Sequence, residues 1–252
     1  MIRMRALSTF ATTLYSPVRR LKQLVRSPLL VAPDVTTLDI CWQQIFKDQI
    51  YRHDEFSIPE SGAILMDVGA NVGVFAAWAA RHYRPARILC FEPDPITYPY
   101  LAKNAATIER SGGETRIEHF QLALSAEDGG KLTLYHAPKL SGGSTMMAVG
   151  KEFGWTSFEV PVTTISRQLR DLAIPTIDLL KVDVEGHALE VLRGIEDGDW
   201  ARIRNIALEC DYVPEGSTTV ESMRGFLSEK GYRTDVDDAS LSNNATVYAW
   251  RD

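Results

Sequence analysis

The stretch Ala63-Ile-Leu-Met-Asp67-Val-Gly69-Ala-Asn71-Val-Gly73 decides the fold of this chain. Its apolar run 63–68, which ends at a glycine, is typical of a buried strand in a parallel sheet. The two glycines allow a tight turn, and residues 72–83 continue as a helix that Pro85 ends. The first N–H groups of such a helix are unpaired, so the turn resembles a nucleotide-binding turn. Its G-x-N-x-G spacing differs from the dinucleotide-binding pattern. This motif alone is therefore also compatible with a structural turn that binds no ligand.

Strands and helices alternate along most of the remaining chain, which predicts a parallel sheet with right-handed crossovers. Ligands bind such sheets beyond the carboxyl ends of the strands, so polar residues at those ends are the candidate site residues. The predicted strands are 87–92, 116–124, 132–135, 158–163, 177–184, 203–210, 232–235 and 246–250. The predicted helices after the first are 95–108, 165–172, 189–195 and 220–230.

An acidic residue ends the second strand: Glu92 lies 25 positions after Asp67. A carboxylate at this place can accept hydrogen bonds from both hydroxyls of a ribose, although it can also cap the helix that opens at Pro95. Asp67 at the turn repels phosphates and suits a ligand with a positive amine. S-adenosylmethionine, which carries an amine, a sulfonium and a ribose, therefore fits better than a nicotinamide dinucleotide.

A third polar group lies in Lys181-Val-Asp183-Val-Glu185-Gly-His187, at the end of the fourth strand of the predicted sheet. Asp183 and Glu185 are two apart on an extended chain and share a side. A carboxylate or imidazole at a strand end can remove a proton from a hydroxyl. The alternative is structural, because an acid near a helix N-terminus is stabilised by the helix dipole.

The charge and the cysteines exclude several classes of protein. The net charge is −6, and six basic residues with no acid lie in residues 1–33, so the rest of the chain carries −12. An acidic body argues against a nucleic-acid partner. The three cysteines at 41, 90 and 210 form no CxxC pair, which argues against a zinc finger or a disulfide framework. The apolar stretch 62–80 contains Asp67 and Asn71 and is expected to be buried structure, not a membrane span.

These motifs together resemble the FkbM-type methyltransferases over about residues 50–250. The resemblance rests on these segments, in order: Asp67-Val-Gly-Ala-Asn-Val-Gly73, Phe91-Glu-Pro93, Ala123-Leu-Ser125, Ile177-Asp-Leu-Leu-Lys-Val-Asp-Val-Glu-Gly-His187 with Gly194, and Glu209. It implies an α/β, Rossmann-like class I methyltransferase fold with helices on both faces. Its seven-stranded sheet would be mostly parallel, with an antiparallel last strand.

The resemblance also implies a cofactor, S-adenosylmethionine, with S-adenosylhomocysteine as its product. Family positions for the cofactor correspond here to Asp67, Gly69, Ala70, Asn71, Gly73, Glu92, Pro93, Ala123, Leu124, Ser125 and Asp183. Among these, Glu92 would hold the ribose, and Ala123, Leu124 and Ser125 would border the adenine. The candidate catalytic residues are Asp183, Glu185 and His187, with Glu185 or His187 as general base.

The function expected is O-methylation of a hydroxyl on a sugar, polysaccharide or polyketide-type molecule. The alternatives are an N-methyltransferase of a peptide or small molecule, and a non-catalytic nucleoside-binding protein. A Mg²⁺ site from Asp183, Glu209 and Asp211 is a further hypothesis, since hard cations prefer carboxylates.

The N-terminal segment lies outside the family pattern. We expect residues 1–50 to form a basic helical arm or cap and residues 51–252 to form the methyltransferase domain, with a mobile loop over about 138–157. Residues 17–26 have a basic amphipathic pattern, which predicts either a capping helix or a weak contact with an anionic membrane surface. The expected location is the cytoplasm, with that membrane contact as the open alternative.

Overall fold

The computed structural model describes residues 30–111, 113–137, 143–146, 154–210, 219–237 and 245–251. Its centre is a seven-stranded sheet with the order β3-β2-β1-β7-β8-β10-β9. The strands are β1 (Ile64–Val68), β2 (Arg87–Phe91), β3 (Arg116–Phe120), β7 (Leu179–Val182), β8 (Asn205–Cys210), β9 (Arg233–Asp237) and β10 (Ala245–Trp250). Strand β10 runs antiparallel to both of its neighbours, while the pairs from β3 to β8 are parallel. The predicted class I methyltransferase fold is therefore confirmed.

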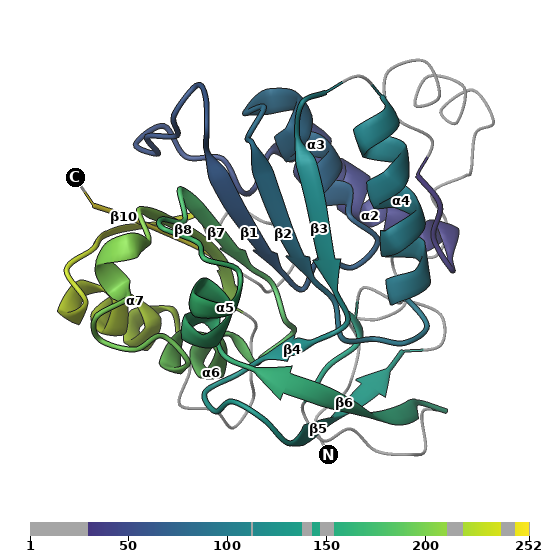
Figure 1. Ribbon diagram of the computed structural model, residues 1–252. Helices are drawn as coiled ribbons and strands as arrows, with labels where there is room; N and C mark the ends of the chain where they lie inside the picture. Colours follow the sequence, from purple (N-terminus) through teal and green to yellow (C-terminus); the bar gives the residue numbers. More distant parts are fainter. Residues whose placement is uncertain are drawn as a thin grey trace.

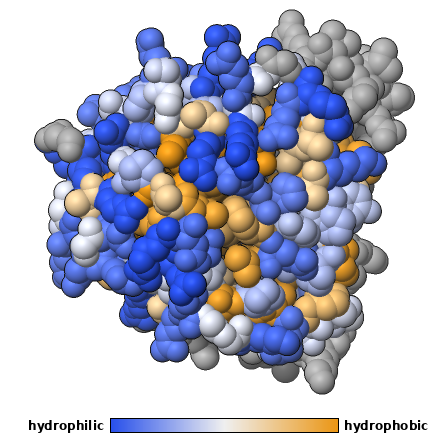
Figure 2. All heavy atoms as spheres, in the orientation of Figure 1, coloured by the Kyte–Doolittle hydropathy of each residue, from blue (hydrophilic) through white to orange (hydrophobic). Residues whose placement is uncertain are grey.

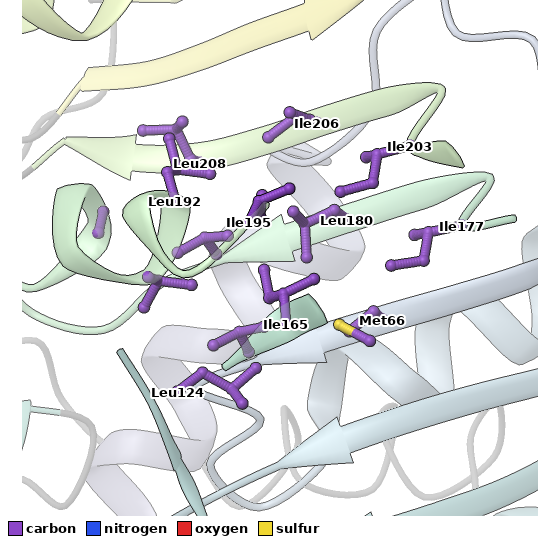
Figure 3. Close-up of a cluster of buried hydrophobic side chains, with 14 of the residues drawn as sticks. Met66, Leu124, Ile165, Ile177, Leu180, Leu192, Ile195, Ile203, Ile206 and Leu208 are labelled. Atoms are coloured by element: carbon purple, nitrogen blue, oxygen red, sulfur yellow. The ribbon is translucent and has the colours of Figure 1, made fainter. Parts of the chain in front are cut away.

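Helices cover both faces of this sheet (Figure 1). One face carries α5 (Ile165–Asp171), α6 (Ala188–Arg193) and α7 (Val220–Glu229), and the other carries α2 (Val35–Trp42), α3 (Val74–His82) and α4 (Tyr98–Arg110). Alternate side chains of β1, β7 and β8 point into the first core, where Met66, Leu180 and Ile206 meet the α5 and α6 residues Ile165 and Leu192 (Figure 3). This is the packing that continuous apolar strands require, because both of their faces must be buried.

A second, three-stranded sheet lies at the carboxyl ends of β1–β3 (Figure 1). Its order is β4-β6-β5, with β4 (Ala123–Leu124), β5 (Lys131–His136) and β6 (Thr156–Thr163). The prediction of one strand over 116–124 is wrong, because β3 ends at Phe120 and β4 pairs with β6 instead of β2. The predicted strands 132–135 and 158–163 belong to this second sheet.

Two predicted boundaries also shift. The helix expected from Pro95 begins only at Tyr98, because the Asp94 carboxylate first accepts hydrogen bonds from the N–H groups of Ile96 and Thr97 and forms a turn. The loop expected over 138–157 ends earlier, since β6 already begins at Thr156. Residues 138–142 and 147–153 of that loop lie outside the described residues.

The chain before β1 is helical where the structure describes it. Asp34 caps α2 by accepting a hydrogen bond from the Thr37 N–H at 2.6 Å, and α2 continues directly into a π-helical turn, η1 (Gln43–Asp48). Ile45 and Tyr51 pack into the second core, on α3. The division at residue 50 stays a prediction, and the basic segment 17–26 lies outside the described residues.

One face of the molecule is mainly polar. Hydrophilic side chains dominate the face in Figure 2, and apolar ones gather in a band through its middle. The exposed large apolar side chains among the described residues are Val35, Ile40 and Ile96. Within the described part of the chain, no helix has the length and apolar character needed to cross a bilayer.

Candidate functional site

A cavity of about 290 Å³ lies at the carboxyl ends of β1, β2, β7 and β8. This is the low end of the usual range for ligand pockets, roughly 300–1,000 Å³. Both the predicted turn and a helix that precedes it contribute to its walls. The lining residues are Thr37, Ile40, Cys41, Gln44, Ile45, Gly69, Ala70, Asn71, Val74, Phe75, Glu92, Pro93, Leu134, Gly143, Ser144, Met146, Lys181, Asp183, Val184, Glu185 and Glu209.

The turn after β1 is held by close backbone contacts. Gly69 has a φ of +75°, and a Cβ at this position would lie 1.7 Å from the carbonyl oxygen of Asp183. Only glycine fits there, and this brings the β1 turn directly against the chain that follows β7. Asn71 also has a positive φ, 49°, and its side-chain oxygen is buried without a hydrogen-bond partner among the described residues. An unpartnered acceptor in a cavity wall is suited to an N–H donor on a ligand.

Glu92 lies at the β2 end of this cavity. Its Oε2 accepts a hydrogen bond from the N–H of Asn71 at 2.8 Å, and its Oε1 accepts one from the N–H of Asp94 at 2.9 Å. Burial raises the pKa of Glu92 to about 7, although the N–H groups of Asp94 and Asn71 oppose this shift. Each carboxylate oxygen retains a second lone pair for a ligand hydroxyl, which is compatible with the predicted contact to ribose.

Asp67 lies beneath the cavity and does not contribute to its lining, because its side chain is fully buried. Lys181 lies between: its Nζ is 2.9 Å from Asp67 Oδ1, 3.6 Å from Asp183 Oδ2, and donates to the carbonyl oxygen of Gly69 at 2.7 Å. Lys181 and Asp67 therefore form a buried ion pair beneath the cavity. Burial lowers the pKa of Lys181, but Asp67 and Asp183 raise it above its ordinary value, so the ammonium stays charged.

The β7–β8 end of the cavity holds two carboxylates joined by a tyrosine. The Tyr51 hydroxyl donates to Asp183 Oδ2 at 2.8 Å and lies 3.4 Å from Glu209 Oε2. The Tyr51 ring packs edge-on against Phe75, 5.6 Å between centroids, and Lys181 Nζ lies 5.5 Å from its centroid. Burial, followed by the charge of Asp183, raises the pKa of Tyr51 well above its ordinary value, so the phenol keeps its proton.

The remaining predicted catalytic residues differ in position. Glu185 lines the cavity and has a φ of 46°, a backbone conformation that a non-glycine residue adopts at some cost. His187 is outside the lining, and its Nε2 lies 2.9 Å from the Ser125 hydroxyl oxygen. Burial lowers the pKa of His187, so the imidazole is neutral at pH 7.

The residues predicted to border adenine are also outside the lining. Ala123 and Leu124 are buried in separate hydrophobic clusters, and the Ser125 side chain contacts His187. Gly73 has a φ of +84° and shapes the turn, without lining the cavity. Ala70 and Pro93 do line it, next to Gly69 and Glu92.

Sequence reasoning did not predict the contacts that Ser144 and Thr145 make beside the cavity. Ser144 donates a hydrogen bond to Asp94 Oδ2 at 2.9 Å, and His136 Nδ1 lies 2.6 Å from the same oxygen. The Thr145 hydroxyl donates to the carbonyl oxygen of Glu185 at 2.6 Å. This short segment thus bridges the turn after Glu92 and the turn that carries Glu185. No pattern in the chain indicates these contacts, because they join residues that are far apart in the sequence.

The Mg²⁺ hypothesis gains no support. Within the described ranges, no group of three His, Cys, Asp or Glu side chains is arranged to hold a metal ion. Asp183 and Glu209 both lie within 3.4 Å of the Tyr51 hydroxyl, and Asp211 falls outside the described residues.

The family model and the relatives that match this chain are those of methyltransferases. A family model described as the methyltransferase FkbM domain matches residues 67–234. Methyltransferase sdnD of Sordaria araneosa is 33% identical over 225 residues, which is 79% of this chain and 83% of that protein. The 31-O-demethyl-FK506 methyltransferase FkbM of Streptomyces tacrolimicus is 30% identical over 195 residues, 67% of this chain and 72% of its own.

A solved structure supports the fold. The crystal structure of methyltransferase FkbM from Methylobacillus flagellatus KT superposes with a TM-score of 0.54 at 15% identity, over 93% of this chain. This chain spans 58% of the length of that solved chain. At this level of identity the likeness concerns the fold alone.

Proposed function

The chain belongs to the FkbM methyltransferase family and is an S-adenosylmethionine-dependent methyltransferase, and we propose that it methylates a hydroxyl group. The acceptor class proposed is a sugar, a polysaccharide or a polyketide-type molecule. The observation that carries the proposal is the pair Asp183 and Glu185 in the wall of one cavity with Glu92, because an alcohol must lose a proton when it is methylated. The name of the Streptomyces relative, which records methylation of 31-O-demethyl-FK506, also supports transfer to oxygen.

The residues at the β1–β2 end fit the cofactor. Glu92 would accept the ribose hydroxyls, while Gly69, Ala70 and Asn71 would lie along the methionine part. The unpartnered Asn71 oxygen suits the ammonium of that part. When bound, the cofactor supplies an electrophilic methyl group on a sulfonium.

The chain's own residues have separate tasks at the other end of the cavity. The Tyr51 hydroxyl donates a hydrogen bond to Asp183 and so holds its carboxylate in place. The proposed role of the Asp183 carboxylate is to orient the ligands and to attract positive charge. Glu185 is the candidate general base, because it lines the cavity from the turn between β7 and α6. His187 is a weaker candidate than the sequence indicates, since Ser125 engages its Nε2 outside the lining.

Calorimetry with S-adenosylmethionine tests the cofactor site, and Glu92→Ala is expected to abolish micromolar binding. Glu159→Gln, at a glutamate on β6 that contacts Thr133, is the matched control and should bind like wild type. Absence of binding by folded wild-type protein would overturn the cofactor assignment.

Transfer of labelled methyl groups to hydroxylated sugars and polyketides then tests the reaction. Glu185→Gln is expected to lower turnover about 100- to 10,000-fold with cofactor binding retained. Glu190→Gln, at the nearby surface ion pair with Arg193, is the control. Full turnover by Glu185→Gln would refute the base, and a methyl group found on nitrogen by mass spectrometry would favour the N-methyltransferase alternative. Binding without turnover on any acceptor would favour a non-catalytic protein.

A further inference from the structure

One wall of the cavity comes from a helical stripe that lies before the matched family domain. Its members are Thr37, Ile40, Cys41, Gln44 and Ile45, which line the cavity from α2 and η1. Their spacing of three and four positions places them on one face of a helix. The match to the family model starts at residue 67, so this wall comes from a segment that precedes the matched residues.

The stripe lies at the end of the cavity opposite Glu92. Cys41 shares the cavity wall with Lys181, Asp183 and Glu209, whose charges act more strongly on the pKa of its thiol than that of Asp34, and all three belong to β7 and β8 or their ends. In the sheet, β1 and β7 separate β2, which Glu92 directly follows, from β8. Tyr51, shortly after η1, reaches the same two carboxylates. The stripe therefore faces the acceptor end and not the ribose end.

The charges of the cavity are strongly unbalanced. Among the described lining residues the acidic ones are Glu92, Asp183, Glu185 and Glu209, and the only basic one is Lys181. The Lys181 ammonium is already bound to Asp67 and to the carbonyl oxygen of Gly69. A carboxylate or phosphate on the acceptor would meet uncompensated negative charge there.

The stripe itself is mostly apolar. Ile40, which is 42% exposed, and Ile45 provide aliphatic surface, and Gln44 provides one neutral amide. Leu134 and Met146 add apolar surface from the second sheet and the 143–146 segment. An exposed isoleucine at a cavity wall offers apolar contact to a ligand.

We propose that Ile40 is a specificity-determining residue and that the acceptor is a neutral molecule whose hydroxyl adjoins an apolar body. This inference rests on the proposed function and narrows its substrate class. It excludes anionic acceptors such as uronic acids and phosphorylated sugars. Acceptor binding is measured on protein already loaded with S-adenosylhomocysteine, so this inference and the proposed function can fail separately.

Three related probes test it in the full-length protein loaded with S-adenosylhomocysteine. They are octyl β-D-glucoside, octyl β-D-glucuronide, which adds a carboxylate, and methyl β-D-glucoside, which lacks the apolar chain. Saturation-transfer NMR below the micellar concentration should show octyl glucoside binding at least tenfold more tightly than either of the others. Equal or tighter binding of the glucuronide or of methyl glucoside, or no binding of octyl glucoside, would overturn the inference.

Variants on α2 locate the effect. Ile40→Arg should raise the affinity for octyl glucuronide, relative to that for octyl glucoside, at least fivefold. Ile40→Ala should reduce the preference for octyl glucoside over methyl glucoside. Val35 is the matched control: it is 44% exposed on the same helix and outside the lining, so Val35→Arg and Val35→Ala should change neither ratio. Equal effects of the Ile40 and Val35 substitutions would refute the role of Ile40. Failure to bind S-adenosylhomocysteine at all would instead overturn the proposed function.

Discussion

At the β2 end of the cavity, backbone N–H groups of Asn71 and Asp94 hold the Glu92 carboxylate, at 2.8 and 2.9 Å. At the β7–β8 end, the Asp183 carboxylate is held by a side chain, because the Tyr51 hydroxyl donates to it at 2.8 Å. Tyr51 lies 132 positions away from Asp183 in the sequence. The first end thus depends on turn geometry near the strands, and the second on packing of a distant segment. Changes in the packing of the distant segment should therefore alter the second end and leave the first intact.

The largest effect on stability is expected from a side chain added at the turn after β1, next to the end of the cavity that backbone N–H groups hold. Gly69→Ala places a Cβ 1.7 Å from the Asp183 carbonyl oxygen and should lower the free energy of unfolding by about 4 kcal/mol or more. Gly129→Ala is the control, because Gly129 also has a positive φ, +85°, but open space around it. It should cost only about 1–2 kcal/mol, the price of the left-handed backbone. Urea unfolding measures both, and equal losses would show that the turn can move away from β7.

The next effect concerns pH. Burial raises the pKa of Glu92 from 4.5 to about 7, so the folded protein holds this proton more tightly than the unfolded chain. The contribution of this proton to the free energy of unfolding is fully present below pH 4.5 and is lost as the pH rises through 7. The free energy of unfolding changes by about 3 kcal/mol over this interval. Urea unfolding of wild type and Glu92→Gln between pH 4.5 and 8 measures the contribution of Glu92. Wild type should lose stability relative to the variant as the pH rises.

The control for this titration is Glu159→Gln, whose difference from wild type should stay flat over the same interval. Glu159 is exposed and bonds to Thr133 on the second sheet. A flat difference for Glu92→Gln as well would show that Glu92 titrates as an ordinary glutamate, and that the backbone N–H groups offset the effect of its burial on the pKa.

A smaller effect is expected at the side-chain-built end. Tyr51→Phe keeps the ring against Phe75 but removes the hydrogen bond to Asp183, and should cost about 2 kcal/mol of unfolding free energy, as for a bond to a charged group. Tyr248→Phe removes a bond to the neutral carbonyl oxygen of Ile50 and should cost about 1 kcal/mol. Calorimetry should find cofactor affinity nearly unchanged in both. A large loss of affinity in Tyr51→Phe would mean that the two ends are not separate.

The sequence predicted the central sheet well because its signals are local. The apolar runs at β1, β2 and β7 mark buried strands by themselves, and Gly69 marks the first turn. Strand β4 was missed because the chain 116–124 is uniformly strand-like, and only its partner β6 determines where it leaves the sheet.

The candidate site was predictable only where it depends on the same local signals. Glu92 and Asp183 follow strands and line the cavity as strand ends should. Tyr51 and Ser144 carry no motif, and their positions follow from tertiary packing. The stripe from Thr37 to Ile45 does have helical spacing, so an amphipathic signal was present, but it does not say which cavity the helix faces.

The smallest effect decides to which end the 143–146 segment belongs. Ser144 donates to Asp94, whose N–H holds Glu92, so Ser144→Ala should weaken S-adenosylmethionine binding about fivefold, the equivalent of about 1 kcal/mol. Ser125→Ala is the matched control, since its hydroxyl contacts His187 outside the cavity lining and its loss should leave the affinity unchanged. Calorimetry distinguishes the two positions. The reverse result would place Ser125 beside the adenine, as the family resemblance implies, and would assign Ser144 to the acceptor end.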